Sequence, residues 1–212
     1  MVEVTIIDYG MGNLLSVQRG FEHCGARVTV TSDPKIILAA ERLVLPGVGA
    51  FRNAMKELSD QDLPDVIRSY VGMGRPLLGI CLGMQLLLDE SEEFGLTQGL
   101  GLIPGRVVQV PAQTIHGKPM KVPHIGWNAL QPAGLDWVGT VLENTPSGAA
   151  AYFVHSFMAQ PTNSENRLAD CLYGGQHIAA VVGVGRVIGC QFHPEKSGEV
   201  GLGILRSFCE FM

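Results

Sequence analysis

The stretch that most constrains the fold is a cysteine between two glycines, at the junction of a strand-like run and a helical run. Residues 76–80 are apolar and strand-like, and residues 84–88 continue as an apolar helical run. The turn between them carries Gly79, Cys81 and Gly83. A sharp strand-to-helix turn crowds the neighbours of its apex, so both flanking positions need glycine. The pattern predicts a nucleophile elbow, in which free N–H groups at a helix start favour a thiolate.

The same pattern also has a plain structural interpretation. With 27 Gly and 5 Cys in 212 residues, a Gly-x-Cys-x-Gly arises by chance about 0.08 times in such a chain. A free cysteine is among the most buried residue types and often only fills space in a core. Cys81 is therefore a candidate nucleophile that needs a base and an orienting group elsewhere in the chain.

Composition favours one α/β domain over residues 1–212, because 46% of the residues are hydrophobic, 17% are charged and glycine is abundant. The net charge of −5 and the lack of a Lys/Arg cluster argue against a nucleic-acid partner. No apolar run reaches the roughly 18 residues that span a bilayer. Residues 1–8 have a strand pattern and lack the basic start of a signal peptide, so we expect a cytoplasmic protein with no membrane contact.

The cysteines are odd in number and show no C-x-x-C spacing, so they are interpreted as reduced thiols. Neither a disulfide framework nor a metal site is predicted, and no cofactor is expected. Gly10 and Gly12 suggest a dinucleotide-binding loop, but the third position of that fingerprint is Leu15, which argues against it. The five cysteines are Cys24, Cys81, Cys171, Cys190 and Cys209.

The first half of the chain alternates apolar strands with amphipathic helices, which predicts a parallel sheet. The second half consists of short alternating β-type runs and a final helix. Together they predict a three-layer α/β fold with a mostly parallel central sheet and an antiparallel extension in the C-terminal half. The expected strands are 2–7, 27–31, 42–45, 76–80, 106–110, 120–130, 150–158, 168–173, 177–184 and 186–192; the helices are 14–25, 50–58, 63–73, 84–88 and 198–212.

The segments between these elements are less informative. Residues 89–93 are acidic and are expected to form a solvated loop. Gly174-Gly175 and residues 183–185 are expected hairpin turns. Residues 131–149 and 161–167 show no pattern that predicts a role.

A base for Cys81 is suggested by the only histidine that has an acid two residues later. His193 and Glu195 flank Pro194, which favours the end of a strand over its centre. If the strand from residue 186 continues, the two side chains share one side and Glu195 can fix the tautomer of the His193 ring. By count alone such a pair arises about 0.3 times here, so a surface histidine beside a solvated carboxylate is the alternative.

These motifs, taken in order, resemble the class I triad glutamine amidotransferases, which have a flavodoxin-like fold. Gly79-Ile80-Cys81-Leu82-Gly83-Met84-Gln85 and His193-Pro194-Glu195 carry that resemblance. Further blocks resemble the branch of glutaminase subunits of imidazole glycerol phosphate synthases, and the third of them is particular to that branch. These blocks are residues 8–13, 46–51, 123–128 and 152–156.

The resemblance implies hydrolysis of L-glutamine to L-glutamate and ammonia. Cys81 would attack the side-chain amide to give a γ-glutamyl thioester. His193 would move the protons, and Glu195 would orient His193. The oxyanion hole would use the N–H groups of Leu82 and, after a backbone flip eased by neighbouring glycines, Val48.

The resemblance also implies a set of residues that hold glutamine. Glu93 would meet the α-amino group, although the adjacent Glu92 is equally acidic. Gln85 could instead be a first-turn helix residue without a ligand. The implied substrate-binding residues are Gly49, Gln85, Glu93, Ser156 and Phe157.

The implied partner is a (β/α)₈-barrel cyclase subunit in a heterodimer, because ammonia released into water would be lost or protonated. Trp127 suits an interface anchor, and a core tryptophan is the alternative. The implied interface residues are His124, Trp127, Asn128, Tyr152, His155 and Lys196.

The expected function is therefore supply of ammonia to a partner that forms imidazole glycerol phosphate and AICAR in histidine biosynthesis. One alternative is a related glutaminase that feeds another acceptor, such as a surface-sugar amidotransferase. A non-catalytic scaffold on the same fold is a third reading. The complete set of Cys81, His193 and Glu195 argues against the scaffold.

Overall fold

The structure, a computed structural model, describes residues 1–134 and 136–211. Its helices are α1 (Leu14–His23), α2 (Pro34–Ala39), α3 (Phe51–Asp60), α4 (Leu63–Gly72), α5 (Leu82–Leu86), α6 (Gly198–Glu210) and the 3-10 turns η1 (Ser164–Asn166) and η2 (Pro194–Lys196). Its strands are β1 (Glu3–Ile7), β2 (Arg27–Thr31), β3 (Leu43–Gly47), β4 (Leu77–Cys81), β5 (Leu88–Ser91), β6 (Thr97–Gln98), β7 (Ile103–Gln109), β8 (His124–Ala129), β9 (Gln131–Pro132), β10 (Ala150–His155), β11 (Phe157–Pro161), β12 (Arg167–Tyr173), β13 (Gln176–Val184) and β14 (Val187–Cys190).

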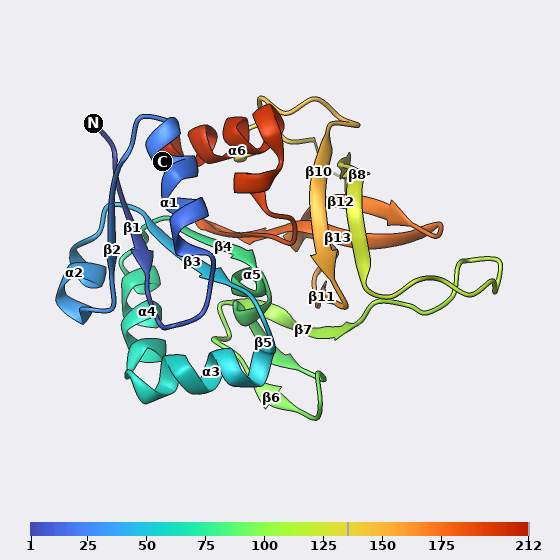
Figure 1. Ribbon diagram of the computed structural model, residues 1–212, viewed down its shortest axis with the longest axis horizontal. Coiled ribbons are helices and arrows are strands. Elements are labelled where there is room, and N and C mark those ends of the chain that lie inside the picture. The colour runs from blue at the N-terminus through green and yellow to red at the C-terminus, as the bar shows by residue number, and fades with distance from the viewer. Residues whose placement is uncertain (135, 212) are drawn as a thin grey trace.

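Within the described residues, the central sheet has eight strands in the order β2-β1-β3-β4-β14-β13-β12-β9. The strands from β2 to β14 pair in parallel, and β13, β12 and β9 extend the sheet in antiparallel fashion. This is the mostly parallel sheet with a C-terminal antiparallel extension that the sequence predicts. The pairing of β4 with β14 brings two segments together that are more than a hundred residues apart in the sequence (Figure 1).

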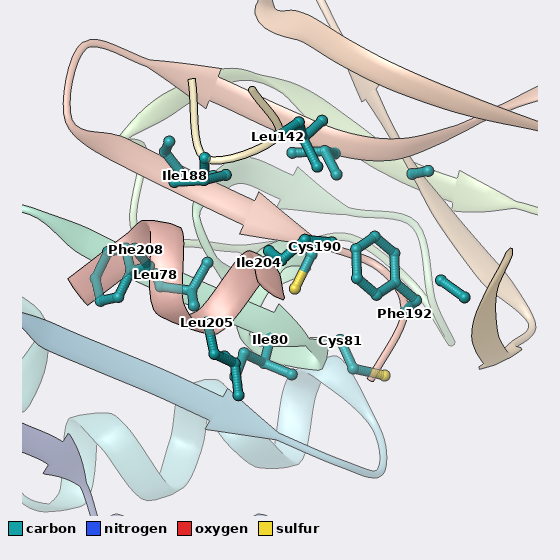
Figure 2. Close-up of a cluster of buried hydrophobic side chains, with 14 of the residues drawn as sticks. Leu78, Ile80, Cys81, Leu142, Ile188, Cys190, Phe192, Ile204, Leu205 and Phe208 are labelled. Carbon is teal, nitrogen blue, oxygen red and sulfur yellow. The ribbon is translucent and has the colours of Figure 1, made fainter. Parts of the chain in front are cut away.

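Helices cover both faces of the sheet, which gives the predicted three layers (Figure 1). Successive residues of a strand face opposite sides, so Leu78 and Ile80 pack in a cluster with α1 and α6, whereas Leu77 packs in a second cluster with α2, α3 and α4. Figure 2 shows the first cluster, with Cys81 at its margin. The sheet therefore holds the end of β4 between two apolar layers.

Two smaller sheets flank the central one. Strands β8 and β10 form an antiparallel pair, and β11, β7, β5 and β6 form a four-stranded sheet. The acidic run 89–93 is predicted as a loop, and this prediction is wrong for its first part. Leu88 and Ser91 are buried while Asp89 is exposed, so β5 is a half-exposed strand that carries its acids outward.

Other boundaries differ from the predicted ones for local reasons. Helix α2 is absent from the prediction; the Asp33 side chain caps it by accepting the Lys35 N–H at 2.8 Å. The run 150–158 divides at Ser156 into β10 and β11. Gly174 and Gly175 form the expected turn, whereas β13 continues through Val184. The predicted last helix ends at Glu210, and Met212 and Leu135 of the loop 131–149 lie outside the described residues.

Among residues 1–134 and 136–211, the helices are all too short or too polar to cross a membrane.

Candidate active site

Cys81 is the last residue of β4, and α5 begins at the next residue. Its backbone has φ 56° and ψ −111°, a conformation that is strained for a residue with a side chain. A Cβ on Gly83 would lie 1.8 Å from the Leu45 carbonyl oxygen, and one on Gly79 would lie 2.7 Å from the Gly83 carbonyl oxygen. Both glycines are therefore required by backbone packing, as the elbow pattern predicts.

His193 and Glu195 form a buried pair beyond the end of β14. The distance between His193 Nδ1 and Glu195 Oε1 is 2.8 Å, and the side chains are only 4% and 1% exposed. Their contact does not come from strand alternation, so the expected continuation of that strand is wrong. The strand ends at Cys190, and the turn η2 brings the carboxylate of Glu195 back to the ring.

The charge state of His193 follows from its two neighbours. Burial lowers its pKa, whereas the Cys81 sulfur and the Glu195 carboxylate raise it, and the resulting pKa is about 9. His193 is therefore protonated at neutral pH, and an imidazolium next to a sulfur stabilises negative charge on that sulfur. This is the electrostatic arrangement that a cysteine nucleophile needs.

Ser197 fixes the main chain of His193, and the sequence analysis did not identify it. The Ser197 hydroxyl donates to the His193 carbonyl at 2.7 Å and accepts the Tyr152 N–H at 2.9 Å. The His193 N–H in turn donates to the Tyr152 carbonyl at 3.0 Å. A serine before a helix resembles an ordinary N-cap, and only the approach of β10 shows its other role.

Two glycines of α6 provide a test of how tightly this helix packs on the His193–Glu195 segment. A Cβ on Gly201 would lie 1.9 Å from the Pro194 carbonyl oxygen, whereas one on Gly203 would meet nothing within 4 Å. We expect Gly201→Ala to lower the free energy of unfolding by about 2 kcal/mol or more. Gly203→Ala should raise it by roughly 0.5 kcal/mol through helix propensity.

Urea unfolding of both variants beside the parent chain measures this difference. Equal stability of the two variants would contradict close packing of α6 on the His193–Glu195 segment. Loss of stability in both would instead point to a general intolerance of α6.

A pocket of about 330 Å³ opens above the Cys81 side chain. It contains every residue proposed for glutamine binding and both proposed oxyanion donors. Its lining residues are Val48, Gly49, Cys81, Leu82, Gln85, Glu93, Pro123, Val154, His155, Ser156, Phe157 and His193.

The choice between Glu92 and Glu93 has a structural answer. Glu93 lines the pocket and accepts the Phe51 N–H at 2.6 Å, so it also anchors the first residue of α3. Glu92 is exposed and pairs with Arg106 at 3.1 Å. Of the two acids, Glu93 is therefore the one that lines the pocket.

Gln85 is only 5% exposed, and both hydrogens of its side-chain amide are used within the protein. Its Nε2 donates to the Phe157 carbonyl and to Gln191 Oε1, each at 2.9 Å. A ligand can therefore meet only the amide oxygen of Gln85. Gln191 was not identified from the sequence, because its position beside Gln85 depends on the pairing of β14 with β4.

The residues expected at a partner interface divide into two groups. Trp127 is 59% exposed, so the alternative of a core tryptophan is wrong. Its ring lies edge-to-face against Tyr152, with ring centroids 6.0 Å apart. Lys196, three residues after His193 in the sequence, is also exposed. Asn128 is partly buried and donates to the Leu172 carbonyl at 2.9 Å.

His124 and His155 are buried, which corrects their assignment as direct partner contacts. Their rings are joined by a hydrogen bond of 2.9 Å between His124 Nδ1 and His155 Nε2, and Tyr173 stacks on His124 at 4.1 Å. Burial lowers the pKa of both, that of His155 to about 4. They are neutral at physiological pH; His124 packs beneath the exposed face, and His155 also lines the pocket.

No cluster of three or more His, Cys, Asp or Glu side chains suited to a metal ion occurs in the described part of the chain.

Comparison with known proteins places this geometry in a family. The family profile described as "Glutamine amidotransferase class-I" matches residues 5–210. A relative from Legionella pneumophila (strain Lens), named "Imidazole glycerol phosphate synthase subunit HisH 1", is 53% identical over 212 residues, covering 99% of this chain and 100% of the relative. A HisH subunit from Geobacter sulfurreducens is 47% identical, covering 99% of each chain.

Solved structures agree on the fold. "Structure of PurLQS from Thermotoga maritima" superposes with a TM-score of 0.75 at 18% identity, covering 100% of this chain and 99% of that one. "Crystal structure of glutamine amidotransferase" gives a TM-score of 0.73 at 18% identity, covering 98% and 97%. The resemblance noted from the motifs is confirmed: the chain belongs to the class-I glutamine amidotransferase family.

Proposed function

We propose that this protein hydrolyses L-glutamine to L-glutamate and ammonia, and passes the ammonia to a synthase partner that makes imidazole glycerol phosphate and AICAR. The proposal rests on one observation: Cys81 and His193 line the same pocket, and Glu195 bonds the far nitrogen of the His193 ring. The relatives named as HisH subunits support the choice of partner. The partner would be a (β/α)₈-barrel cyclase subunit in a heterodimer.

The reaction would use the charges already present in the site. Cys81 attacks the side-chain amide carbon of glutamine while the protonated His193 supplies a proton to the leaving ammonia. His193 then takes a proton from water, which cleaves the γ-glutamyl thioester and frees the thiolate. Glu195, bonded to Nδ1, keeps the other ring nitrogen directed to the reacting atoms.

The oxyanion would be stabilised by main-chain N–H groups. Leu82 follows the nucleophile at the start of α5, and Val48 lines the same pocket between Gly47 and Gly49. Gly49 has φ +103°, a conformation that glycine adopts without strain. A peptide flip at Val48 would therefore cost little free energy and would bring a second N–H donor to the site.

The surface proposed to meet the cyclase is the outer face of the β8–β10 pair. Ile125, Trp127 and Val154 are 52%, 59% and 37% exposed, and the cross-strand pairs Trp127–Tyr152 and Ile125–Val154 place their side chains together. Val154 also lines the pocket. Ammonia that leaves Cys81 would thus emerge beside an apolar patch that a partner can seal.

The test is glutamine turnover by the chain alone, and by the chain with its copurified barrel subunit and acceptor ligand. We expect strong activation by the partner. Trp127→Ala should weaken binding of the partner by roughly 30-fold and leave the turnover of the isolated chain unchanged. Ammonia release that needs no partner would indicate an independent glutaminase. Activation by a different synthase would indicate another acceptor.

A further inference from the structure

A buried glutamine stands next to the nucleophile and takes no part in the proposed triad. Gln191 is 0% exposed and follows the last residue of β14. Its Nε2 lies 3.8 Å from the Cys81 sulfur, and its Oε1 accepts from Gln85 Nε2 at 2.9 Å. A primary amide that is completely removed from water needs a hydrogen-bond partner for its oxygen and for its N–H₂ group, because unpaired buried polar groups are costly.

The orientation of this amide is fixed by a main-chain carbonyl. The Phe157 oxygen can only accept, so Gln85 must direct its N–H₂ group toward it. The second hydrogen of the same nitrogen then reaches the oxygen of Gln191. With its oxygen occupied, Gln191 presents its own N–H₂ group to the Cys81 sulfur; the flipped amide would set two N–H₂ groups against each other in a buried space.

The Phe157 carbonyl, which accepts from Gln85, is itself held in place. The Phe157 carbonyl also accepts from His155 Nδ1 at 2.8 Å, and His155 Nε2 faces His124 Nδ1 at 2.9 Å. Both rings are neutral at physiological pH for the reason given above, so the donor pattern does not change in the working range. The Gln85–Gln191 pair is therefore anchored at its far end by buried, non-titrating groups.

We infer that Gln191 is a catalytic residue that donates an N–H to the Cys81 sulfur and stabilises its thiolate, with Gln85 as the positioning residue that aims this donor. The inference rests on the proposed glutaminase function and deepens it. Hydrogen bonds to a charged acceptor are about twice as strong as those between neutral groups, so the N–H favours the thiolate over the thiol.

The same bond would act twice in the reaction. Before attack it raises the fraction of sulfur present as thiolate, and this gain exceeds the accompanying loss of nucleophilicity, which is only about half as large in logarithmic terms. When water cleaves the thioester, the departing sulfur regains its negative charge and the N–H stabilises it as a leaving group. Gln191 moves no proton itself.

A pH profile of Cys81 can be interpreted because, of the titratable groups near it, His193 is the one that changes its charge. Tyr9, two residues after the end of β1, and Cys190, the last residue of β14, both lie near Cys81, and burial raises the pKa of each, so they remain neutral. His193, with Glu195 behind it, is the neighbour that titrates, with a pKa of about 9. A change seen on altering Gln191 can then be assigned to the sulfur–imidazole pair.

The experiment follows the rate at which iodoacetamide alkylates Cys81 between pH 5 and pH 10, resolved by peptide mass spectrometry. The half-buried Cys24 in the same chain serves as the internal reference. In Gln191→Leu we expect the profile of Cys81 to move upward by about one pH unit and its rate near neutral pH to fall about threefold, because the more basic thiolate regains part of the lost rate. Cys24 should be unchanged, as should both thiols in Gln131→Leu, a glutamine that is exposed on β9.

Two further variants separate the donor from its support. Gln191→Glu replaces the N–H₂ group with a carboxylate oxygen, so it should lower the alkylation rate more than the leucine variant does. Gln85→Leu keeps the donor but removes its orienting partner and should give a smaller shift in the same direction. A Cys81 profile in Gln191→Leu that superposes on that of the parent chain would overturn the inference.

A measurement on the unaltered chain covers the case in which these variants fail to fold. In a ¹⁵N-glutamine-labelled sample, one buried side-chain N–H₂ pair should shift when Cys81 is alkylated, and no such shift would refute the contact. Alkylation requires no glutamine, so this readout is independent of turnover. A parent chain that releases no ammonia even with its partner and acceptor ligand would refute the proposed function, whereas turnover with an unaltered Gln191→Leu profile would refute only the role of Gln191.

Discussion

Replacement of Cys81 by alanine is expected to reduce glutamine turnover by about 10⁴-fold or more, because no other group in the pocket can form the thioester. The pocket residues that would hold glutamine are untouched, so the variant should still bind the substrate. Alanine at this position meets the same backbone strain as cysteine at φ 56°. Ammonia release should be measured for the isolated chain and with its partner.

Cys24→Ala is the matched control for this prediction. Cys24 is half-buried, its thiol donates to the Leu202 carbonyl at 3.4 Å, and it does not line the pocket. We expect its turnover to equal that of the parent chain. Unchanged ammonia release by Cys81→Ala would rule out the proposed nucleophile, and thermal unfolding of both variants would show that neither result reflects loss of the fold.

Replacement of Gly83 by alanine is expected to have the largest effect on stability. Its Cβ would lie 1.8 Å from the Leu45 carbonyl oxygen and 2.8 Å from the carbonyl carbon. Strand β3 cannot retreat freely, because Leu45 and Gly47 pair with Gly79 and Cys81 of β4. We expect the free energy of unfolding to fall by about 3 kcal/mol or more, or the chain to fail to fold.

Gly72→Ala provides the comparison, since a Cβ on this last residue of α4 would meet nothing within 4 Å. Urea unfolding of this variant should match the parent chain within about 0.5 kcal/mol. A Gly83→Ala variant as stable as Gly72→Ala would show that the elbow has room for a side chain. The steric explanation of the glycine pattern would then be wrong.

The sequence predicts local features of this molecule well, because they depend on neighbouring residues. The alternation of strands and helices, the parallel core and the elbow at Cys81 follow from short patterns of apolar residues and glycines. The antiparallel extension follows from the turn glycines at 174 and 175. The acids at 89 and 90 were misleading because charge on the outer side of a half-exposed strand looks like charge in a loop.

The parts that could not be predicted depend on contacts between distant segments. The His193–Glu195 pair was identified for a reason that proved wrong, since a 3-10 turn and not a strand brings the two together. Gln191 reaches the sulfur only because β14 lies beside β4. His124 and His155 were expected at a surface, and only the pairing of β8 with β10 turns their rings into a buried layer.

The proposed reaction cleaves glutamine through a covalent bond to Cys81. Rapid acid quench of the chain during turnover, followed by peptide mass spectrometry, tests it directly. We expect a γ-glutamyl group on the peptide that contains Cys81, formed at the rate of ammonia release and absent in Cys81→Ala. Turnover of glutamine with no label on that peptide, or with the label on another residue, would contradict it.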